Sequence, residues 1–242
     1  MAHDGQDVTL SSGNPVLPGL LELTAAAVAP AEAILEAATA KLRDAVSVDG
    51  KASVARVEAE QTGTHGLAWL ATYVESLRQM QAWGERLSAE GKFGEAEQLL
   101  LQIAFGEYLW QIYGGIAMNQ GEIVRLQDMR LAQDEMGALM APAVITLTQT
   151  GNTQAARTRL VELLVEQSAN TTFGNTGLDE ELEMIREQFR RYAVEKVEPY
   201  AHEWHLKDEL IPMEIIEELS EMGVFGLTIP ENLGGLGLSK AS

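Results

Sequence analysis

The sequence of 242 residues contains no cysteine. This absence excludes disulfide bonds, a thiolate nucleophile, and zinc or iron–sulfur sites held by cysteine side chains. Proteins without disulfides are typical of reducing compartments, and no basic-then-apolar leader follows Met1. We therefore expect a cytoplasmic protein.

Positively charged residues are also scarce. Lysine and arginine number 17 against 36 aspartate and glutamate residues, which gives a formal net charge of -19. An acidic surface repels phosphate backbones and anionic lipid headgroups, so we expect no nucleic acid and no membrane among the partners. The apolar runs near 17–35 and 137–147 are interrupted by charge and proline or are too short to cross a bilayer.

Strand patterns are nearly absent, and apolar residues recur instead at spacings of three and four. These spacings predict an all-α fold that follows a loose, flexible tail at residues 1–16. In the first helix, Pro30 is expected in the first turn, with Ile34, Ala38 and Leu42 on the apolar face. The helices of this part are expected at about 30–46, 53–88, 93–112, 116–140 and 152–164.

The second of these helices is the longest. One side of it carries a row of residues that we expect to face inward: Val54, Val57, Gln61, His65, Trp69, Tyr73, Leu77, Met80 and Leu87. Asp49-Gly50 breaks the chain before this helix, and Gly91 is a natural stop after it. Asn152 is a suitable N-cap for the last helix of this part.

A polar stretch with two glycines and two asparagines, residues 169–177, predicts a domain boundary. We place a helical-bundle extension at 17–170 and a second region at 171–242. The elements expected in the second region are an amphipathic helix at 179–197, a short helix at 199–204, a helix at 212–222 stopped by Gly223, and an irregular loop at 226–239.

The string His202-Glu203-Trp204-His205 invites a metal site. Zinc-binding helices of that type place two histidines at i and i+4, so that both imidazoles share a face. Here the spacing is i+3, and the sequence offers no evident third ligand. The pattern favours surface histidines beside a packed tryptophan, and we expect no metal.

Two further features have structural as well as functional interpretations. Gly234-Gly235-Leu236-Gly237 could cradle a phosphate, but a dinucleotide loop follows a buried strand and opens a helix, whereas a helix and a proline-containing loop precede these glycines. A tight turn with positive φ is favoured. His65 lies on a largely apolar helix face, which favours a core histidine over a catalytic one.

The second region resembles acyl-CoA dehydrogenases in four successive pieces. Residues Asp179–Pro199 resemble the first helix of that family, and Ala201–Trp204 resemble its short second helix. Residues Ile211–Gly226 resemble the third helix, and Ile229–Leu238 resemble the loop that closes it. The order and the spacing of all four pieces match the family.

The first region carries a second resemblance. Residues Thr64–Arg78 and Gly114–Arg125 are similar to the helical extension that precedes the dehydrogenase module in methylsuccinyl-CoA dehydrogenases. This resemblance implies an all-α fragment: the helical extension, then the first helices of a truncated dehydrogenase N-terminal domain. The parent family is α+β, with a helical domain, a middle β-domain and a C-terminal four-helix bundle.

The resemblance also implies chemistry for the parent protein. In this family, which uses FAD, a glutamate removes the proton α to a thioester carbonyl while the β-hydride passes to the flavin, and hydrogen bonds stabilise the enolate-like oxygen. The implied substrate is a short branched acyl-CoA, first (2S)-methylsuccinyl-CoA, which becomes mesaconyl-CoA. The implied partners are an electron-transferring flavoprotein and further copies of the chain, as a homodimer or a dimer of dimers.

No catalytic, flavin-contacting or metal-binding residue of the family falls on these positions. The loop with Asn232, Leu233, Gly234 and Gly235 is expected to line the outer wall of the acyl pocket, with a structural turn as the alternative. Two other functions stay open. One is an acyl-CoA dehydrogenase for another acyl-CoA, and the other is a non-catalytic helical interaction protein that keeps only the first helices of the dehydrogenase.

Overall fold

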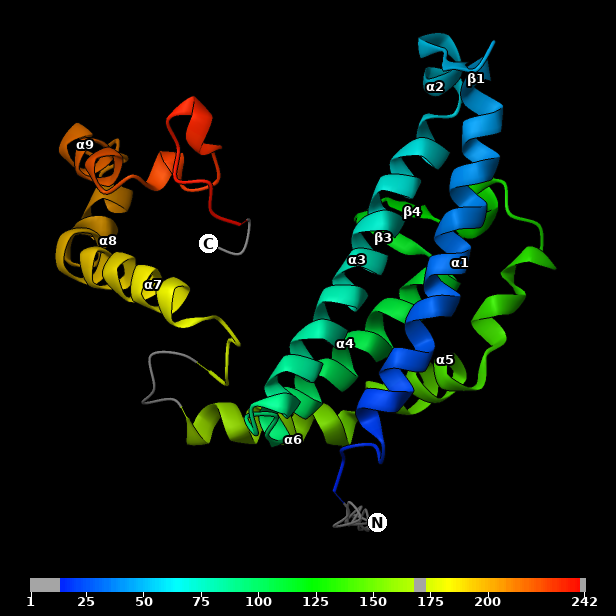
Figure 1. The fold of residues 1–242 in the computed structure, drawn as a ribbon, viewed down its shortest axis with the longest axis horizontal. Coiled ribbons are helices and arrows are strands. Elements are labelled where there is room, and N and C mark those ends of the chain that lie inside the picture. The colour runs from blue at the N-terminus through cyan, green and yellow to red at the C-terminus, as the bar shows by residue number, and fades with distance from the viewer. Residues whose placement is uncertain (1–13, 168–172, 240–242) are drawn as a thin grey trace, which may run out of the picture. The chain divides into compact units, whose positions relative to one another are not determined.

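The computed structural model describes residues 14–167 and 173–239 (Figure 1). The chain divides into two compact units, Met1–Asn175 and Thr176–Ser242. The boundary expected between residues 170 and 171, and most of the tail expected at 1–16, lie outside the described residues. The described part is mostly helical with few strands, as the spacing of apolar residues predicts.

Three long helices build the first unit: α1 (Leu20–Val46), α3 (Gln61–Ala89) and α4 (Glu95–Gly114). Figure 1 shows them running side by side, with α1 packed along α3 and α3 against α4. Their facing sides form one continuous core, because apolar side chains recur at three- and four-residue spacing. The largest fully buried side chains on these helices include Ile34, Leu42, Leu70, Leu77, Phe105 and Leu109.

Helix α1 starts ten residues earlier than the position of Pro30 predicts. It begins at Leu20, after Gly19 in the left-handed region, and Pro30 lies inside it. An interior proline removes one backbone hydrogen bond and costs about 3 kcal/mol. The turns before it are nevertheless fixed by packing, since Thr24 and Ala27 are buried and the Thr24 hydroxyl donates to the side chain of Gln81 on α3.

The inward face of α3 matches the predicted row only in part, since Leu77 and Leu87 are buried as expected and most of the other buried positions differ. The buried residues are Gly63, Gly66, Leu70, Val74, Leu77, Gln81, Gly84 and Leu87, whereas His65 is exposed and Trp69 and Tyr73 are half-buried. The glycines decide the face because they let other segments approach the helix backbone. A Cβ on Gly66 would lie 2.5 Å from Val124 Cγ2, and one on Gly63 would lie 2.6 Å from a backbone oxygen. The helix also starts later than expected, since α2 (Val54–Ala59) is separate from it.

Asp49-Gly50 is a hairpin turn as well as a helix break. Strands β1 (Ser47–Val48) and β2 (Lys51–Ala52) pair antiparallel across it, and both turn residues have positive φ, 50° and 76°. Two consecutive left-handed residues match the twist of a two-residue hairpin, which explains the Asp-Gly sequence.

The helix predicted at 116–140 is wrong. The chain forms a second antiparallel hairpin, β3 (Ile116–Asn119) with β4 (Glu122–Val124), and then 3-10 helices at Leu126–Met129 and Glu135–Met140. Gly115, at φ 134°, ends α4 and turns the chain into β3. The apolar residues of this segment follow a strand pattern, with Ile116 and Val124 buried, and this pattern overrides the weak helical periodicity.

The first unit closes with α5 (Pro142–Thr146), a π-helix at Leu147–Gly151 that packs against α4, and α6 (Gln154–Glu166). The residue that caps α6 is Thr153, whose hydroxyl accepts from the Ala156 N–H at 3.2 Å. Asn152, predicted as the cap, instead donates to Glu107 and accepts from Arg157. The prediction was one residue off because both residue types cap helices well.

The described end of the expected tail is held in place. The Gln102 side chain on α4 accepts from the Leu17 N–H at 2.7 Å and donates to the Pro15 carbonyl at 3.0 Å. Gln102 is fully buried and also donates to the Gly151 carbonyl. Residues 14–16 are therefore part of the folded unit, contrary to the prediction of a loose tail up to residue 16.

The second unit contains α7 (Glu180–Tyr192), a π-helix turn (Ala193–Val197), α8 (Glu198–Leu206) and α9 (Met213–Glu221). Asp179 caps α7, and its carboxylate accepts from the Leu182 N–H at 2.9 Å. Pro199 lies in the first turn of α8, and Gly223, at φ 80°, stops the chain after α9, as predicted. Two 3-10 turns, Val224–Gly226 and Glu231–Leu233, complete the unit.

Burial differs sharply between the units. Within residues 176–239 every residue is at least partly exposed to solvent, although α7 and α9 are strongly amphipathic. The predicted inner faces, such as Ile185 and Phe189 on α7 or Ile216 and Leu219 on α9, are only half-buried. Across the described part of the chain, no helix combines the length and the apolar character that are needed to span a membrane.

Candidate functional site

The glycine loop of the second unit has a defined geometry. Gly234 and Gly237 have positive φ of 86° and 63°, a region that glycine enters without strain. Gly235 is required for a different reason, because a Cβ there would lie 2.1 Å from the carbonyl oxygen of Ile229. Each of the three glycines therefore has a backbone role that another residue would perform poorly.

Backbone hydrogen bonds fold this loop back on the segment that precedes it. The N–H groups of Leu236, Gly237 and Leu238 donate to carbonyls of residues 226, 229 and 227, at 2.9, 2.8 and 2.8 Å. These N–H groups are thus used within the loop and are not free to cradle a phosphate. A 3-10 turn precedes the glycines in place of a strand, so the geometry is that of a tight turn and not of a dinucleotide loop.

The four residues expected at a pocket wall lie together on this loop. Asn232 and Leu233 belong to the 3-10 turn Glu231–Leu233, and Gly234 and Gly235 follow directly. Leu233 is 73% exposed, and Leu236 beside it is 52% exposed. The loop thus presents an apolar, rigid surface with one carboxylate, Glu231, and such a surface suits contact with an apolar group better than acid–base chemistry.

The two histidines of α8 do not form a metal site in this structure. His202 and His205 are both exposed, and the half-buried Trp204 between them stacks on Tyr200 at a centroid distance of 5.9 Å. In the described residues, no three histidine, aspartate or glutamate side chains gather closely enough to hold a metal ion. The packed tryptophan matches the interpretation of this string as surface histidines beside an aromatic residue.

His65 is exposed on α3 and is not the core histidine that the pattern predicts. Its Nε2 accepts from the Trp69 indole N–H at 3.1 Å. The next aromatic residue of the row, Tyr73, stacks on Tyr108 with centroids 4.6 Å apart and donates to Gln111 Oε1 at 2.7 Å. Burial raises the pKa of Tyr73, which keeps its proton in that hydrogen bond. This group therefore joins α3 to α4 and does not present a reactive centre.

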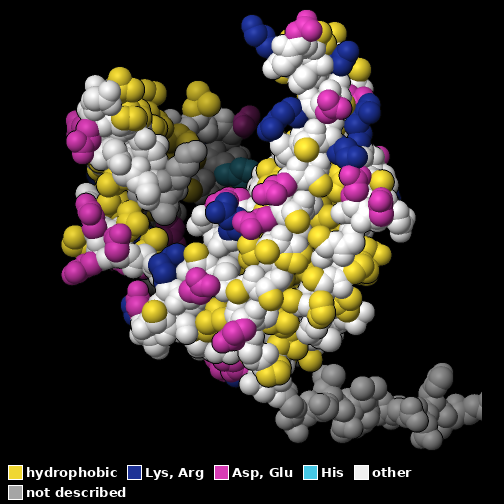
Figure 2. All heavy atoms as spheres, turned by 45° about the vertical axis from the view of Figure 1, so that its right-hand side comes forward, with side chains coloured by type: hydrophobic (Ala, Val, Ile, Leu, Met, Phe, Trp, Pro, Cys, Tyr) yellow, Lys and Arg dark blue, Asp and Glu magenta, His cyan; other side chains and the backbone are white. Residues whose placement is uncertain are grey.

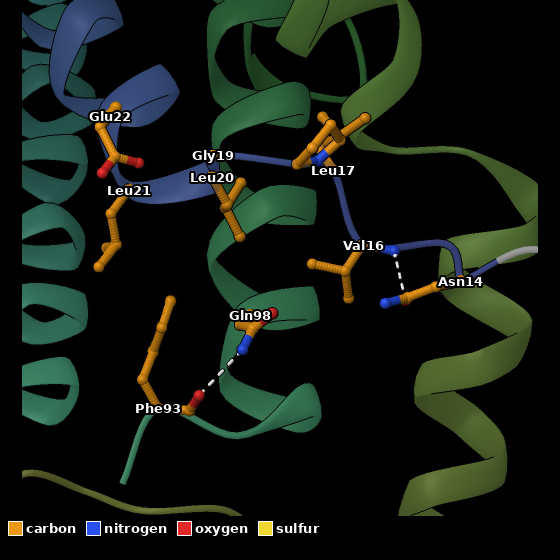
Figure 3. Close-up of a pocket in the computed structure, with 10 residues that line it drawn as sticks. Asn14, Val16, Leu17, Gly19, Leu20, Leu21, Glu22, Phe93 and Gln98 are labelled. Atoms are coloured by element: carbon orange, nitrogen blue, oxygen red, sulfur yellow. Dashed lines mark hydrogen bonds between the residues drawn. The ribbon is translucent and has the colours of Figure 1, made fainter. Parts of the chain in front are cut away.

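The first unit has a hollow of about 430 Å³ where the chain enters α1 (Figure 3). Leu21 and Phe93 point toward the same space, and Glu22 in the first turn of α1 lies beside them. The rest of the lining is mostly apolar, with the neutral amides of Asn14 and Gln98. A lone carboxylate disfavours an anionic ligand, and no second titratable group faces it, so this hollow does not contain the elements of a catalytic site.

Charged side chains elsewhere pair with one another on the surface. Around the end of the first unit where β1 and α2 lie, lysine and arginine are mixed with acids (Figure 2). In the second unit, hydrogen bonds from Tyr192 and Lys196 lower the pKa of Glu218, and the Lys196–Glu218 pair, at 3.2 Å, ties the turn after α7 to α9. Exposed pairs of this kind contribute little stability.

One buried acid was missed by the sequence analysis. Glu97, in the first turn of α4, is 3% exposed, and its Oε1 accepts from the Asn175 N–H at 2.7 Å and from Asn175 Nδ2 at 2.9 Å. The Trp83 indole N–H donates to the Asn175 carbonyl at 3.2 Å. These contacts fix the last residue of the first unit. Nothing in the sequence pairs positions 97 and 175, so no pattern could have revealed this clamp.

Comparison with known proteins supports both resemblances. Residues 179–242 match the family model described as acyl-CoA dehydrogenase, N-terminal domain. The chain is 58% identical over 231 residues, 96% of its length, to (2S)-methylsuccinyl-CoA dehydrogenase of Cereibacter sphaeroides. This alignment covers 41% of that protein, so the chain spans well under half of its relative.

Two other relatives align with about a quarter of the chain. Glutaryl-CoA dehydrogenase of Desulfococcus multivorans is 32% identical over 26% of this chain and 16% of its own length. Mitochondrial isobutyryl-CoA dehydrogenase of Dictyostelium discoideum is 33% identical over 27% of this chain and 16% of its own length. Of these three relatives, the methylsuccinyl-CoA enzyme is similar over nearly the whole chain, and the other two over about a quarter of it.

Proposed function

We propose that this chain, whose residues 179–242 carry the start of an acyl-CoA dehydrogenase N-terminal domain, is the N-terminal part of an FAD-dependent acyl-CoA dehydrogenase. The observation that carries this proposal is the 58% identity over 96% of the chain. Identity of this extent includes the helical first unit, whereas the two shorter alignments cover only about a quarter of the chain. The proposed parent fold adds a middle β-domain and a C-terminal four-helix bundle.

The proposed substrate is a short branched acyl-CoA, (2S)-methylsuccinyl-CoA, with mesaconyl-CoA as product. The substrate loses its α-hydrogen as a proton to a carboxylate base and its β-hydrogen as a hydride, which FAD accepts when it is bound. A carbon–carbon double bond forms between the two positions, and the two electrons leave to an electron-transferring flavoprotein. Glutaryl-CoA and isobutyryl-CoA are the alternative substrates, because two further relatives of the chain are named for them.

The described residues do not fit a flavin site. A dinucleotide needs free backbone N–H groups or cations for its pyrophosphate. The loop at 234–237 has used these N–H groups internally, and the hollow beside Glu22 presents an acid. We therefore assign no flavin contact and no catalytic step to these residues, and we place both in the part of the enzyme that follows.

The role proposed for Asn232, Leu233, Gly234 and Gly235 is to form the outer wall of the acyl pocket. The rigid turn and the exposed Leu233 side chain support this role, since an apolar surface held by backbone hydrogen bonds suits a wall. We further propose that the enzyme acts in the cytoplasm as a homodimer or a dimer of dimers. The cysteine-free sequence is compatible with that compartment.

The test uses the purified full-length protein, its visible absorption spectrum and anaerobic titration with acyl-CoA substrates. We expect a flavin spectrum that bleaches with (2S)-methylsuccinyl-CoA, and much less with glutaryl-CoA or isobutyryl-CoA at the same concentration. Bleaching by one of the other two alone would keep the enzyme class and reject the substrate. A colourless protein that does not bind added FAD would reject the enzyme and favour a helical interaction protein.

A further inference from the structure

Two hollows of similar size lie side by side on the first unit. One, of about 290 Å³, is lined by residues of α4, α5 and the neighbouring 3-10 and π-helices, including Trp110, Val144 and Ile145. The other, of about 310 Å³, is lined by residues that include Arg125. Tyr113 and Met140 line both hollows, so these two side chains form a ridge between them, and each is 50% exposed.

This face is built from two long uncharged stretches of an acidic chain. No charged residue occurs from Tyr108 to Gly121 or from Met136 to Ala156, although charged residues make up 22% of the sequence. The fold brings these two stretches together at the hollow beside Trp110, whose lining is entirely uncharged. We refer to Trp110, Tyr113, Met140, Val144, Ile145 and Thr148 as the neutral face.

The neutral face also has the composition of an interface core. Trp110 is 56% exposed and stacks on Tyr113 with centroids 5.8 Å apart and planes 20° apart. Tryptophan, tyrosine and methionine are enriched in interface cores, and charged residues are depleted there. Because the two rings already hold each other in place, little side-chain entropy remains to be lost on binding.

We propose that the homo-oligomer of the proposed function forms through this surface, so that the neutral face binds the neutral face of a second copy of this chain. Two copies with a net charge of -19 each repel one another over most of their surfaces, and an uncharged patch is where that repulsion is weakest. A two-fold contact needs one surface that is complementary to itself. A ridge flanked by two hollows meets this need, since the ridge of each copy enters a hollow of the other.

A cysteine cross-link in the full-length protein tests this contact, because these 242 residues contain no native thiol. Met140→Cys places a thiol on the ridge, and Ser88→Cys places one at an exposed position near the end of α3 as a matched control. Under mild oxidation we expect Met140→Cys to give a disulfide-linked dimer on a non-reducing gel, several-fold more than Ser88→Cys. Peptide mass spectrometry should locate the bond between the two introduced thiols.

A second variant tests whether the cross-link requires contact through the neutral face or only random encounters between two molecules. Tyr113→Glu, combined with Met140→Cys, puts a like charge on each ridge and should abolish the cross-link while circular dichroism shows an unchanged helix content. Equal cross-linking of the Met140→Cys and Ser88→Cys proteins would overturn the proposal. So would a cross-link that persists with Tyr113→Glu, or a thiol at position 140 that is shielded by another part of the same polypeptide and does not cross-link.

Discussion

The two units use similar helices but bury them very differently. In the first unit, α1, α3 and α4 enclose a core in which Ile34, Leu77 and Phe105 are fully buried. In the second unit, α7 and α9 have equally clear apolar faces, yet within residues 176–239 none of their side chains is buried. Amphipathic helices owe most of their stability to the surface that covers the apolar face. The second unit therefore has the pattern of a folded domain without a complete core.

This difference assigns different roles to the two units. The first unit has a complete buried core, as an independent domain needs. The second unit has apolar helix faces that stay exposed, as expected of one part of a larger domain. The family match over 179–242 and the 41% coverage of the methylsuccinyl-CoA enzyme agree with this division. If the proposed function holds, the exposed apolar side chains of the second unit, such as Leu210, Met213 and Phe225, are expected to contact the rest of the enzyme.

The largest expected effect is a difference in stability between two phenylalanine-to-alanine substitutions, one in each unit. Phe105→Ala removes a fully buried ring from α4 and should lower the free energy of unfolding by about 3–5 kcal/mol. Phe225→Ala removes a ring that is 59% exposed and should change it by less than about 0.5 kcal/mol in the 242-residue chain. Urea unfolding followed by circular dichroism measures both, and similar losses would contradict the comparison.

A second pair of variants tests the glycine-lined face of α3. Gly66→Ala places a Cβ 2.5 Å from Val124 and should destabilise the first unit by about 1–3 kcal/mol. Gly114→Ala, at the end of α4, meets nothing within 4 Å and should be neutral or stabilising by up to about 1 kcal/mol, because alanine favours the helix. Thermal unfolding compares the two, and a neutral Gly66→Ala would show that α3 and β4 pack less closely than described.

The clamp on Asn175 gives a smaller effect. Glu97→Ala leaves the Asn175 N–H and side-chain amide without their acceptor and should cost about 1–3 kcal/mol. The matched control is Glu95→Ala, two residues away, which breaks a partly exposed pair with Arg159 and should cost about 1 kcal/mol or less. Faster amide exchange at Asn175 in the Glu97→Ala protein alone would confirm the clamp, and equal exchange in both variants would argue against it.

The smallest expected effect is a pH dependence of the second unit. The pKa of Glu218 is lowered by hydrogen bonds from Tyr192 and Lys196, so its contribution is present above the ordinary glutamate pKa and is lost as the pH falls through the lowered value. We expect a slight loss of helix contacts between the α7 turn and α9 below about pH 4. NMR shifts of α9 against pH measure this loss, with Glu218→Gln as a control that should show no such step.

Helix positions were predictable where local signals agreed with packing. The helix ends predicted at Gly91 and Gly223 and the helix start predicted at Pro199 were correct. Each of these residues acts through its own backbone conformation. The helix start predicted at Pro30 and the helix predicted at 116–140 were wrong, because tertiary contacts determine the structure of both segments. The packed side of α3 was predicted only in part. Leu77 and Leu87 were correct, but the aromatic residues suggested a face shifted from the one on which small glycines allow close approach.

The site was less predictable than the fold. The sequence did identify the glycines of the loop at 234–237 as turn residues, because positive φ is a local property. It did not reveal the Glu97–Asn175 clamp or the neutral face, because both join segments that are distant in the chain. The role of Asn232 and its neighbours in an acyl pocket stays a prediction.

Hydrogen–deuterium exchange tests the comparison between the units most directly, with the 242-residue chain measured beside the full-length protein. Our account predicts that α1, α3 and α4 exchange equally slowly in both, because their core is complete. It predicts that α7 and α9 exchange rapidly in the 242-residue chain and slowly in the full-length protein, where the rest of the dehydrogenase covers them. Equal protection of α7 and α9 in the two proteins would contradict the account.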